Sequence, residues 1–379
     1  MKTIISVGGR FWAFHQAEQL NKFNALDYII TTSYNRNEEK IPDSKIKAIR
    51  SPELLGGLLR RTPFLNKSPL WNTVKDDLFD RFASSIVSKT DIFIGYASYS
   101  LKTLQKAKQL GAITVLERGN IHILDQNELM REEHEKLGVK FIVNRVLTEK
   151  QLVEYDESDY ISVPCEYIKK SFIDRGYPSN KIFVLSLGVD LEKFSKLPRE
   201  DDKFRIIYVG GIQARKGILY LLEAFAKLRG LDAELVLVGT VYPEMRETMK
   251  KYEGIYKYSP PVDQSKLQRF YSCSSVFVIP SIDDGFAMVT AEAMACGLPI
   301  IVTTNTGISD VIEEGRHGFV VPIRDSEAIA DKIEILYRGK SLLKYMGAEA
   351  HLKSKELTWN AYGERMMRIY NGLLKGNKI

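Results

Sequence analysis

The chain has 379 residues, which at about 150 residues per domain indicates two or three domains. Hydrophobic residues make up 44% and charged residues 27%, a balance that excludes a disordered chain and a collagen-like repeat. The formal net charge is +6, so a polyanion is allowed as a partner but is not required. No basic run with interleaved aromatic residues is present, and we expect no nucleic-acid partner.

The cysteines and the apolar runs exclude further classes. The three cysteines show no C-x-x-C spacing, so we expect neither a zinc site nor a disulfide framework. The apolar run that begins at Thr3 ends at a glycine pair and is too short for a signal peptide, and no later run is long enough to span a membrane. We therefore expect a cytoplasmic chain, with a peripheral position at a membrane as the alternative.

Short apolar runs alternate with segments of helical periodicity, which is the pattern of βαβ units in a parallel sheet. In the first half of the chain this pattern predicts strands at Thr3–Val7, Asp27–Thr31, Asp91–Gly95, Ala112–Leu116, Tyr160–Val163 and Ile182–Leu185. In the second half it predicts strands at Arg205–Val209, Glu234–Val238, Ile255–Tyr258, Val276–Ile279, Pro299–Val302 and Gly318–Val321. Each set of strands indicates one doubly wound α/β domain.

A polar, charged stretch without periodicity separates the two sets of strands and predicts a linker over residues 188–203. We expect an N-terminal Rossmann-like domain over residues 1–187 and a C-terminal one over residues 204–359. A terminal helix over about 360–379 is expected to pack back onto the N-terminal domain. In facing domains of this kind the carboxyl ends of the strands border a shared cleft, where we expect the active site.

One segment departs from this pattern because it combines an apolar patch with basic flanks. Residues Leu54–Leu59 are leucine and glycine, and the flanking cations are Lys45, Lys47, Arg50, Arg60, Arg61 and Lys67. Such a segment is able to contact an anionic membrane surface or to hold an acceptor. An ordinary helix or loop with solvated ends is the other interpretation, because prolines and glycines interrupt any amphipathic helix.

Glycines and two adjacent cations follow the strand predicted at Arg205–Val209. They come directly before a helix predicted over Gly217–Arg229, and they are Gly210, Gly211, Arg215 and Lys216. Glycine backbone can approach a phosphate closely, and the cations can neutralise it. The spacing is neither that of a P-loop nor G-x-G-x-x-G, which disfavours an NTPase and a standard dehydrogenase. Two solvated cations are the alternative interpretation.

A second group of polar residues lies between a strand that ends at Ile279 and a helix that begins near Phe286. Asp283 and Asp284 form an acidic turn, and the backbone N–H groups of the helix start make an anion site without a metal. Asp284 and Glu292 are eight positions apart and could bind different hydroxyl groups of one ligand. A capping role for Asp284, an ion pair for Glu292 and a metal at the two aspartates are the alternatives.

These motifs resemble the family 4 glycosyltransferases, which are retaining enzymes with the two-domain GT-B fold. The resemblance covers nearly the whole chain and rests on the segments Ser186–Asp190 with Phe194, Tyr208–Phe225, Pro280–Pro299, Thr304–Ile312 and Gly315–Pro322. It implies that a sugar moves from a nucleoside diphosphate sugar to an acceptor hydroxyl with retention, in glycan biosynthesis and without a metal cofactor. The N-terminal domain would bind the acceptor and the C-terminal domain the donor. The acceptor would be a glycan, a lipid-linked molecule or a small molecule.

The resemblance also implies roles for single residues. Catalytic roles fall on Lys216 and Arg215 at the donor diphosphate, on Asp284 at the donor sugar, and on His122 at either sugar. Glu292 would hold the ribose, and the rest of the donor would contact Gly210, Gly211, Ser259, Pro260, Gly285, Phe286, Ala287, Met288 and Val289. The loop that faces the acceptor or the phosphates is expected at Gly8, Gly9, Arg10 and Arg118.

Two positions depart from the family pattern. Asp284 stands where the family usually has Glu, and Gly211 stands where many members have Arg. The shorter acid is expected to bear on sugar preference, and Arg215 is expected to supply the missing charge. Two alternatives stay open: a nucleotide-sugar epimerase of similar architecture and a non-catalytic nucleotide-sugar-binding subunit. The base, the sugar, the acceptor, the linkage and the oligomeric state do not follow from the sequence.

Overall fold

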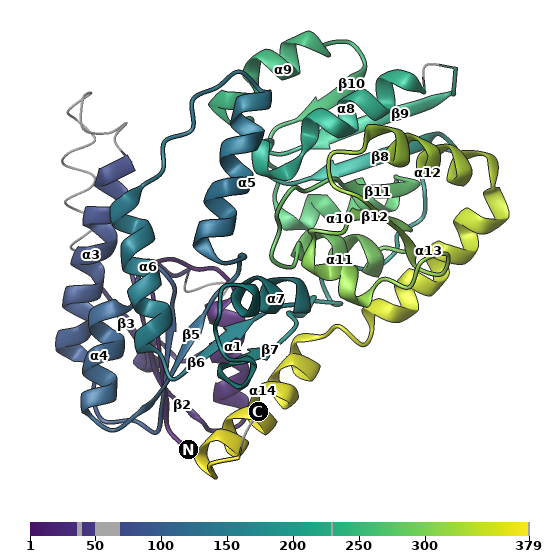
Figure 1. Ribbon diagram of the computed structural model, residues 1–379. Helices are drawn as coiled ribbons and strands as arrows, with labels where there is room; N and C mark the ends of the chain where they lie inside the picture. Colours follow the sequence, from purple (N-terminus) through teal and green to yellow (C-terminus); the bar gives the residue numbers. More distant parts are fainter. Residues whose placement is uncertain (36–39, 50–68, 229, 378–379) are drawn as a thin grey trace.

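The computed structural model describes residues 1–35, 40–49, 69–228 and 230–377, and of residues 69–72 it describes the backbone alone. Two parallel β-sheets occupy separate halves of the molecule, and helices lie on both faces of each sheet (Figure 1). The purple-to-teal half comes first in the chain and the green-to-yellow half second, and helix α5 stands between them.

Both sheets are doubly wound. In the described residues the N-terminal sheet has seven strands in the order β3-β2-β1-β4-β5-β6-β7, with β1 Thr3–Val7, β2 Leu26–Thr31, β3 Ile46–Ala48, β4 Ile92–Tyr96, β5 Ile113–Glu117, β6 Tyr160–Val163 and β7 Ile182–Val184. The C-terminal sheet of this same part has six strands in the order β10-β9-β8-β11-β12-β13, with β8 Phe204–Val209, β9 Ala233–Val238, β10 Tyr256–Ser259, β11 Val276–Ile279, β12 Ile300–Thr303 and β13 Gly318–Val321. Neighbouring strands run parallel, so their carboxyl ends share one edge of each sheet.

Helices cover both faces of each sheet. Those of the first half are α1 Ala13–Lys22, α3 Pro69–Ile86, α4 Leu101–Gln109, α5 Ile123–Lys136, α6 Arg145–Glu157 and α7 Glu166–Asp174. Those of the second half are α8 Ile218–Lys227, α9 Arg246–Lys251, α10 Gln264–Ser272, α11 Met288–Ala295, α12 Ser326–Arg338 and α13 Lys340–Ser354, and α14 Trp359–Leu374 ends the chain. Strands covered on both faces bury whole apolar runs, as Ile4 with Ile5 and Ile206 with Ile207 show, each with no exposed surface.

The predicted strands are confirmed, with ends that differ by at most one residue. The exception is β3, which the sequence pattern missed. It has three residues, lies at the sheet edge and carries Lys47 at its centre, so it has no apolar run to recognise. The helix expected near Phe286 begins two residues later, at Met288. Ala287 has a left-handed backbone conformation with φ of 54° and is the N-cap residue, so the helical conformation starts only after it.

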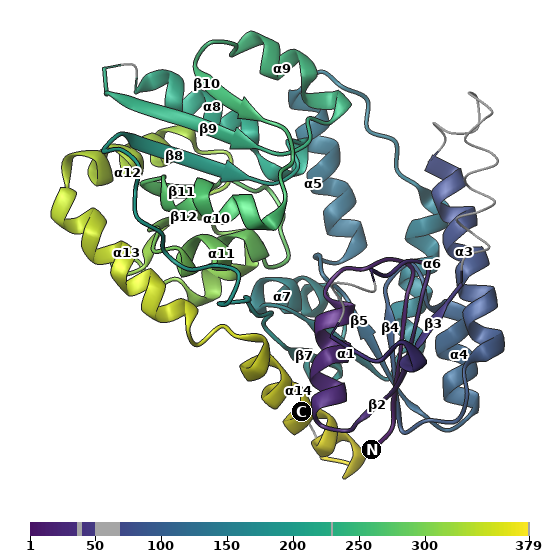
Figure 2. The ribbon, with the colours of Figure 1, turned by 180° about the vertical axis from the view of Figure 1, so that it is seen from behind.

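The chain crosses between the two halves twice. The first crossing is the segment after β7, and the second leads from α13 into α14, which lies along α1 in the N-terminal half (Figure 2). The crossings touch each other, because Val189 N donates to Leu357 O at 2.8 Å. Helix α14 is held by a ring stack of Trp359 on His15, with centroids 4.2 Å apart, and by the Arg365 guanidinium, which donates to Ser186 O at 3.0 Å.

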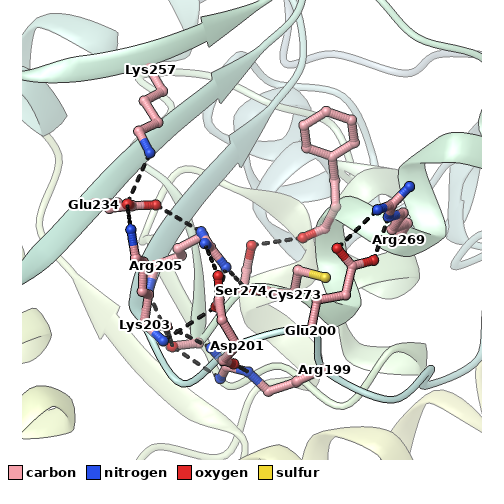
Figure 3. A network of polar contacts seen from close by, with 12 residues as sticks. Arg199, Glu200, Asp201, Lys203, Arg205, Glu234, Lys257, Arg269, Cys273 and Ser274 are labelled. Atoms are coloured by element: carbon pink, nitrogen blue, oxygen red, sulfur yellow. Dashed lines mark hydrogen bonds and ion pairs between the residues drawn. The ribbon is translucent and has the colours of Figure 1, made fainter.

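The last residues of the expected linker are attached to the C-terminal sheet by a network of charges (Figure 3). Glu234 on β9 accepts from Lys203 at 3.0 Å, from Arg205 at 2.8 Å and from Lys257 at 2.8 Å. Lys257 first, and then Lys203 and Arg205, outweigh partial burial and lower the pKa of Glu234 to about 2. Asp201 binds the other side of Arg205. Any pivot between the two halves therefore lies before this network.

The basic, apolar segment predicted as a membrane or acceptor contact falls mainly outside the described residues: Leu54–Leu59, Arg50, Arg60, Arg61 and Lys67 all do. Two of its flanking cations are described, and both bind their own domain. Lys45 Nζ donates to Asn21 Oδ1 and Leu26 O at 2.9 Å, and Lys47 Nζ lies 3.2 Å from the centre of the Tyr28 ring. Within the described ranges, no helix is long and apolar enough to cross a bilayer.

Candidate active site between the two sheets

The two motifs singled out in the C-terminal half lie against each other at the carboxyl edge of its sheet. The loop after β8 carries the cations, and the loop after β11 carries the acids. Ile282 N donates to Arg215 O at 2.9 Å, which ties the loops together. Gly217 has φ of 63°, and a Cβ at this position would overlap Pro280 O. Glycine is therefore required here for the loops to meet.

The meeting point is a buried ion pair between Lys216 Nζ and Asp284 Oδ2. Their side chains are 12% and 10% exposed. Burial would raise the pKa of Asp284, but Lys216 and Arg215 outweigh it and hold this pKa below its usual value. The Arg215 guanidinium donates to Asp283 O at 2.7 Å, so both cations stay beside the acidic turn.

Helix α11 begins at this ion pair. Phe286 is buried, whereas Met288 and Val289 are half-buried at the helix start. Among the described residues no side chain caps the helix, and Ala287 precedes it in a left-handed conformation. The first backbone N–H groups of α11 are therefore available for an anion that lies beside Lys216.

Glu292 lies about one turn after Met288 in α11 and is 8% exposed. It accepts a hydrogen bond from Tyr271 OH at 3.0 Å, and burial raises its pKa to about 7 in spite of Tyr271 and Lys193. Glu292 lines a small cavity that shares His15 and Met288 with a groove of about 810 Å³. The walls of that groove come from both halves, with Arg10, Phe11 and His15 on one side and Asp263, Gln264 and Met288 on the other.

The remaining donor residues lie at the ends of β8 and β10. Gly210 has φ of 146°, and Tyr208 OH donates to Gly211 O at 2.8 Å. Ser259 is half-buried and Pro260 is exposed, and Gly239 N donates to Ser259 O at 3.0 Å. These residues share the sheet edge with Lys216, but they do not line the groove.

The N-terminal half contributes the loop after β1. A Cβ on Gly8 would overlap the Tyr99 ring, and one on Gly9 would lie 3.2 Å from the Phe11 ring. The hydroxyls of Thr32 and Thr31 donate to the carbonyl oxygens of these glycines at 3.0 and 3.2 Å. The hydrogen bonds from these threonines thus fix the loop, and the exposed Arg10 that follows lines the groove.

Arg118 and His122 are both buried in the N-terminal half. The Arg118 guanidinium is buried and donates to the carbonyl oxygens of Asn120 and Ile121 and to Gln151 Oε1. His122 is 2% exposed, and its ring lies among Tyr155, Phe172 and Tyr177. Burial lowers the pKa of His122 to about 4, so the ring is neutral at pH 7. Because both side chains are buried and held by contacts within the N-terminal half, the geometry gives no support to a direct role at a sugar or phosphate.

The comparisons with known proteins agree with this geometry. The family described as Glycosyl transferases group 1 matches residues 203–339. Residues 203–339 are thus similar to a group 1 glycosyltransferase domain, and the C-terminal half that contains them is called the group 1 domain below. Similar curated proteins include the capsular polysaccharide biosynthesis glycosyltransferase CapM of Staphylococcus aureus, with 29% identity over 63% of this chain and 67% of CapM. They also include a D-inositol 3-phosphate glycosyltransferase of Pseudarthrobacter chlorophenolicus, with 28% identity over 52% of this chain and 51% of that protein. The chain thus spans about half to two thirds of these relatives.

Solved structures match the whole chain. Sucrose-phosphate synthase from Thermosynechococcus elongatus superposes with a TM-score of 0.71 at 17% identity and covers 100% of both chains. Anabaena HepE, solved in complex with UDP and glucose, has a TM-score of 0.71 at 14% identity and covers 98% of this chain and 100% of its own. At these identities the likeness concerns the fold, and the predicted GT-B architecture is confirmed.

In the group 1 domain the carboxylates of the adjacent residues Asp283 and Asp284 point in different directions. Asp284 faces Lys216, whereas Asp283 Oδ2 accepts from Gln126 Nε2 at 2.9 Å. The carboxylates therefore do not converge, which argues against the metal-pair interpretation. In the described part of the chain, no group of three or more His, Cys, Asp or Glu side chains could hold a metal ion.

Sequence reasoning missed the contacts that join the N-terminal half to the group 1 domain. Besides Gln126, the Cys165 thiol donates to Gly285 O at 3.1 Å and Glu166 N donates to Asp310 Oδ2 at 2.6 Å. A Cβ on Gly285 would overlap Gly119 O. The sequence holds no signal for these contacts, because each joins residues more than a hundred positions apart.

A second set of contacts between the halves lies further along α5. Glu133 is buried, accepts from Tyr220 OH at 3.1 Å and pairs with Arg324. Arg324 also binds Glu132 at 2.8 Å. Helix α5 of the N-terminal half is thus docked on the group 1 domain at both its start and its end.

Proposed function

We propose that this chain is a retaining glycosyltransferase, which moves a sugar from a nucleoside diphosphate sugar to an acceptor hydroxyl in glycan biosynthesis. The observation that carries the proposal is the position of Lys216 and Arg215 beside Asp284 and the start of α11, at the edge facing the other half of the chain. Two cations and a helix start in one partly buried place match the charge of a diphosphate.

The chemistry follows from that charge. The bond between the sugar C1 and the diphosphate oxygen breaks, and the electron pair leaves with the nucleoside diphosphate. A bond forms between C1 and the acceptor oxygen, and the hydroxyl proton passes to the released diphosphate or to solvent. Lys216 and Arg215 stabilise the negative charge that grows on the leaving diphosphate, which lowers the barrier. Retention of configuration rests on the family resemblance.

The nature of the donor is supported by the ligands bound in similar structures. HepE has been solved with UDP and with UDP-glucose, which makes UDP-sugars the first donors to test. CapM acts in capsular polysaccharide biosynthesis by its name, which supports a glycan as the acceptor. We propose that the two cations serve in place of a divalent metal, so that activity persists in EDTA.

The experiment is a thermal-shift screen of UDP, GDP, ADP and their glucose conjugates, followed by assays of nucleotide release. A ligand at 100 times its dissociation constant adds about 2.7 kcal/mol of stability, a shift that is easily measured. Lys216→Ala is expected to lower turnover at least about a hundredfold. Lys227→Ala is the matched control, because this exposed lysine pairs with Glu327 on α12.

Each other outcome points to a different function. A shift without turnover indicates a binding subunit, and sugar conversion without acceptor indicates an epimerase. No shift with any nucleotide would contradict a donor site at Lys216, as would full activity of Lys216→Ala.

A further inference from the structure

One side chain of the N-terminal half reaches the loops that carry the cations. Gln126, in the first turn of α5, donates from Nε2 to Asp283 Oδ2 at 2.9 Å across 157 positions of sequence. Asp283 has no exposed surface, and its second carboxylate oxygen has no hydrogen-bond partner among the described residues. The amide of Gln126 is thus the one side-chain donor to this carboxylate in the described part of the chain.

The orientation of that amide is set from its other side. Arg118 Nη2 donates to Gln126 Oε1 at 3.1 Å, while the rest of the guanidinium is held by Ile121 O and Gln151 Oε1. Because a guanidinium only donates, the oxygen of the Gln126 amide faces Arg118 and its NH₂ group faces Asp283. The buried Arg118 thus fixes the orientation of the Gln126 amide.

Asp283 in turn holds Arg215. The Arg215 guanidinium donates to Asp283 O at 2.7 Å, and Ile282 N, one residue before, donates to Arg215 O at 2.9 Å. Residue 283 is therefore tied to both the side chain and the backbone of Arg215. A displacement of Asp283 shifts the guanidinium that lies next to Lys216.

We propose that Gln126 is a positioning residue, which couples the docking of the N-terminal half to the placement of Arg215 through Asp283. The inference rests on the proposed function, because it assigns Arg215 to the donor diphosphate. If the halves separate, water takes the place of Gln126 at Asp283 and residue 283 is less constrained. When they dock, the amide replaces that water and fixes Arg215. Gln126 therefore affects sugar transfer, which needs both halves, and has little effect on nucleotide binding to the group 1 domain.

The first test compares Gln126→Ala with Asn127→Ala. Asn127, the next residue of α5, donates to Thr148 Oγ1 within its own half and is the matched control. The readouts are kcat with the active donor from the screen, UDP-glucose first, and the Kd of its nucleoside diphosphate by calorimetry. Gln126→Ala is expected to lower kcat at least about tenfold and to change Kd less than about threefold, because a buried carboxylate loses its donor only in the docked form. Asn127→Ala is expected to change neither.

Two results would overturn the inference: wild-type kcat in Gln126→Ala, or equal losses in kcat and in nucleotide affinity. A wild-type chain without turnover would count against the proposed function instead. In that case X-ray scattering with UDP still tests the coupling, because Gln126→Ala is expected to have a larger radius of gyration than wild type and Asn127→Ala is not. Equal radii would then overturn the inference.

The second test is Gln126→Glu, which places an acid against Asp283. The titratable and charged groups that face this position are Arg118 from the loop after β5, Arg215 from the loop after β8, Cys165 and Tyr167 from the start of α7, and Asp284 with Lys216 behind Asp283. One of the two facing acids must hold a proton for a hydrogen bond to form. The kcat of Gln126→Glu relative to wild type is expected to rise as the pH falls from about 8 to about 5. A ratio that does not change with pH would overturn the inference.

Discussion

Lys216 and Asp284 form a buried ion pair between the loops that follow β8 and β11. The pair is the point at which the two motifs of the C-terminal half meet, and Arg215 lies beside it through Asp283. A carboxylate thus already neutralises the cation assigned to the donor. Any diphosphate that binds Lys216 competes with Asp284, so this acid sets the balance between nucleotide affinity and contact with the sugar.

Asp284→Asn is therefore expected to have opposite effects on binding and on turnover. Nucleoside diphosphate affinity rises several-fold because Lys216 is released, whereas turnover falls at least about tenfold because the carboxylate proposed to contact the sugar is lost. The free energy of unfolding falls by about 2 kcal/mol because a buried ammonium loses its partner, and saturating UDP restores most of it. Calorimetry, kinetics and urea unfolding measure the three effects. Weaker nucleotide binding in Asp284→Asn would contradict the competition.

Glu292 predicts a dependence of nucleotide binding on pH. Burial raises its pKa from 4.5 to about 7, so the side chain is largely protonated below that pH and ionised above it. An ionised carboxylate accepts hydrogen bonds from two ribose hydroxyls, so UDP affinity is expected to rise as the pH increases through 7. Glu292→Gln is the control, because it keeps the titration of the phosphate and removes that of the side chain. Identical pH profiles for the two proteins would contradict the assignment of Glu292 to the ribose.

The same pKa bears on stability. Because the folded-state pKa of Glu292 lies above the ordinary value, the folded chain holds the extra proton between about pH 4.5 and 7. The free energy of unfolding is expected to fall across this interval as the pH rises. In Glu292→Gln this part of the decline is absent, which urea unfolding at a series of pH values measures.

Ala287 predicts a substitution that stabilises the chain. A non-glycine residue in the left-handed region costs about 1 kcal/mol, and Ala287 has φ of 54°. Ala287→Gly removes that cost but makes the unfolded chain more flexible, so we expect a net gain of roughly 0.5 kcal/mol. Ala291→Gly, inside α11, is the matched control and is expected to lose at least about 1 kcal/mol. Urea unfolding measures both free energies. Equal destabilisation of Ala287→Gly and Ala291→Gly would contradict the backbone strain at Ala287.

Substitution of Gly285 is expected to give a variant that binds nucleotide normally but transfers the sugar more slowly. A Cβ at this position overlaps Gly119 O of the other half, so Gly285→Ala is expected to hold the halves apart. Turnover falls at least about tenfold, and nucleoside diphosphate affinity changes little, because Lys216 and α11 belong to the group 1 domain. Gly230→Ala, where a Cβ meets no atom of the described part of the chain within 4 Å, is the control. Full turnover in Gly285→Ala would show that the contact is not needed.

The sequence predicted the sheets well, because parallel strands covered on both faces are apolar runs such as Val276–Ile279. The family resemblance assigned Lys216 and Asp284 to one donor, but the sequence did not predict the ion pair between them. It did not predict β3, which lacks an apolar run. Nor did it predict that His122 would be buried among aromatic rings, because periodicity says nothing about the direction of a loop side chain.

Contacts across the two halves were beyond the sequence for a different reason. The bond from Gln126 to Asp283 depends on how two separately folded units dock, and a hydrogen bond of this kind leaves no spacing pattern. The family resemblance implied that Arg118 belongs to the loop that faces the acceptor or the phosphates. Its guanidinium binds backbone carbonyl oxygens and two glutamine side chains of its own half, which its position after a strand does not reveal.

The double crossing has a practical consequence for cutting the molecule. Because α14 returns to α1 after the C-terminal sheet is complete, a single cleavage in residues 190–198 leaves the halves joined through residues 355–358. A nicked chain is expected to run as two bands on a denaturing gel and as one particle in gel filtration. Removal of α14 would instead strip Trp359 from His15 and open the base of the N-terminal half, so separate expression of the halves calls for α14 supplied with the first.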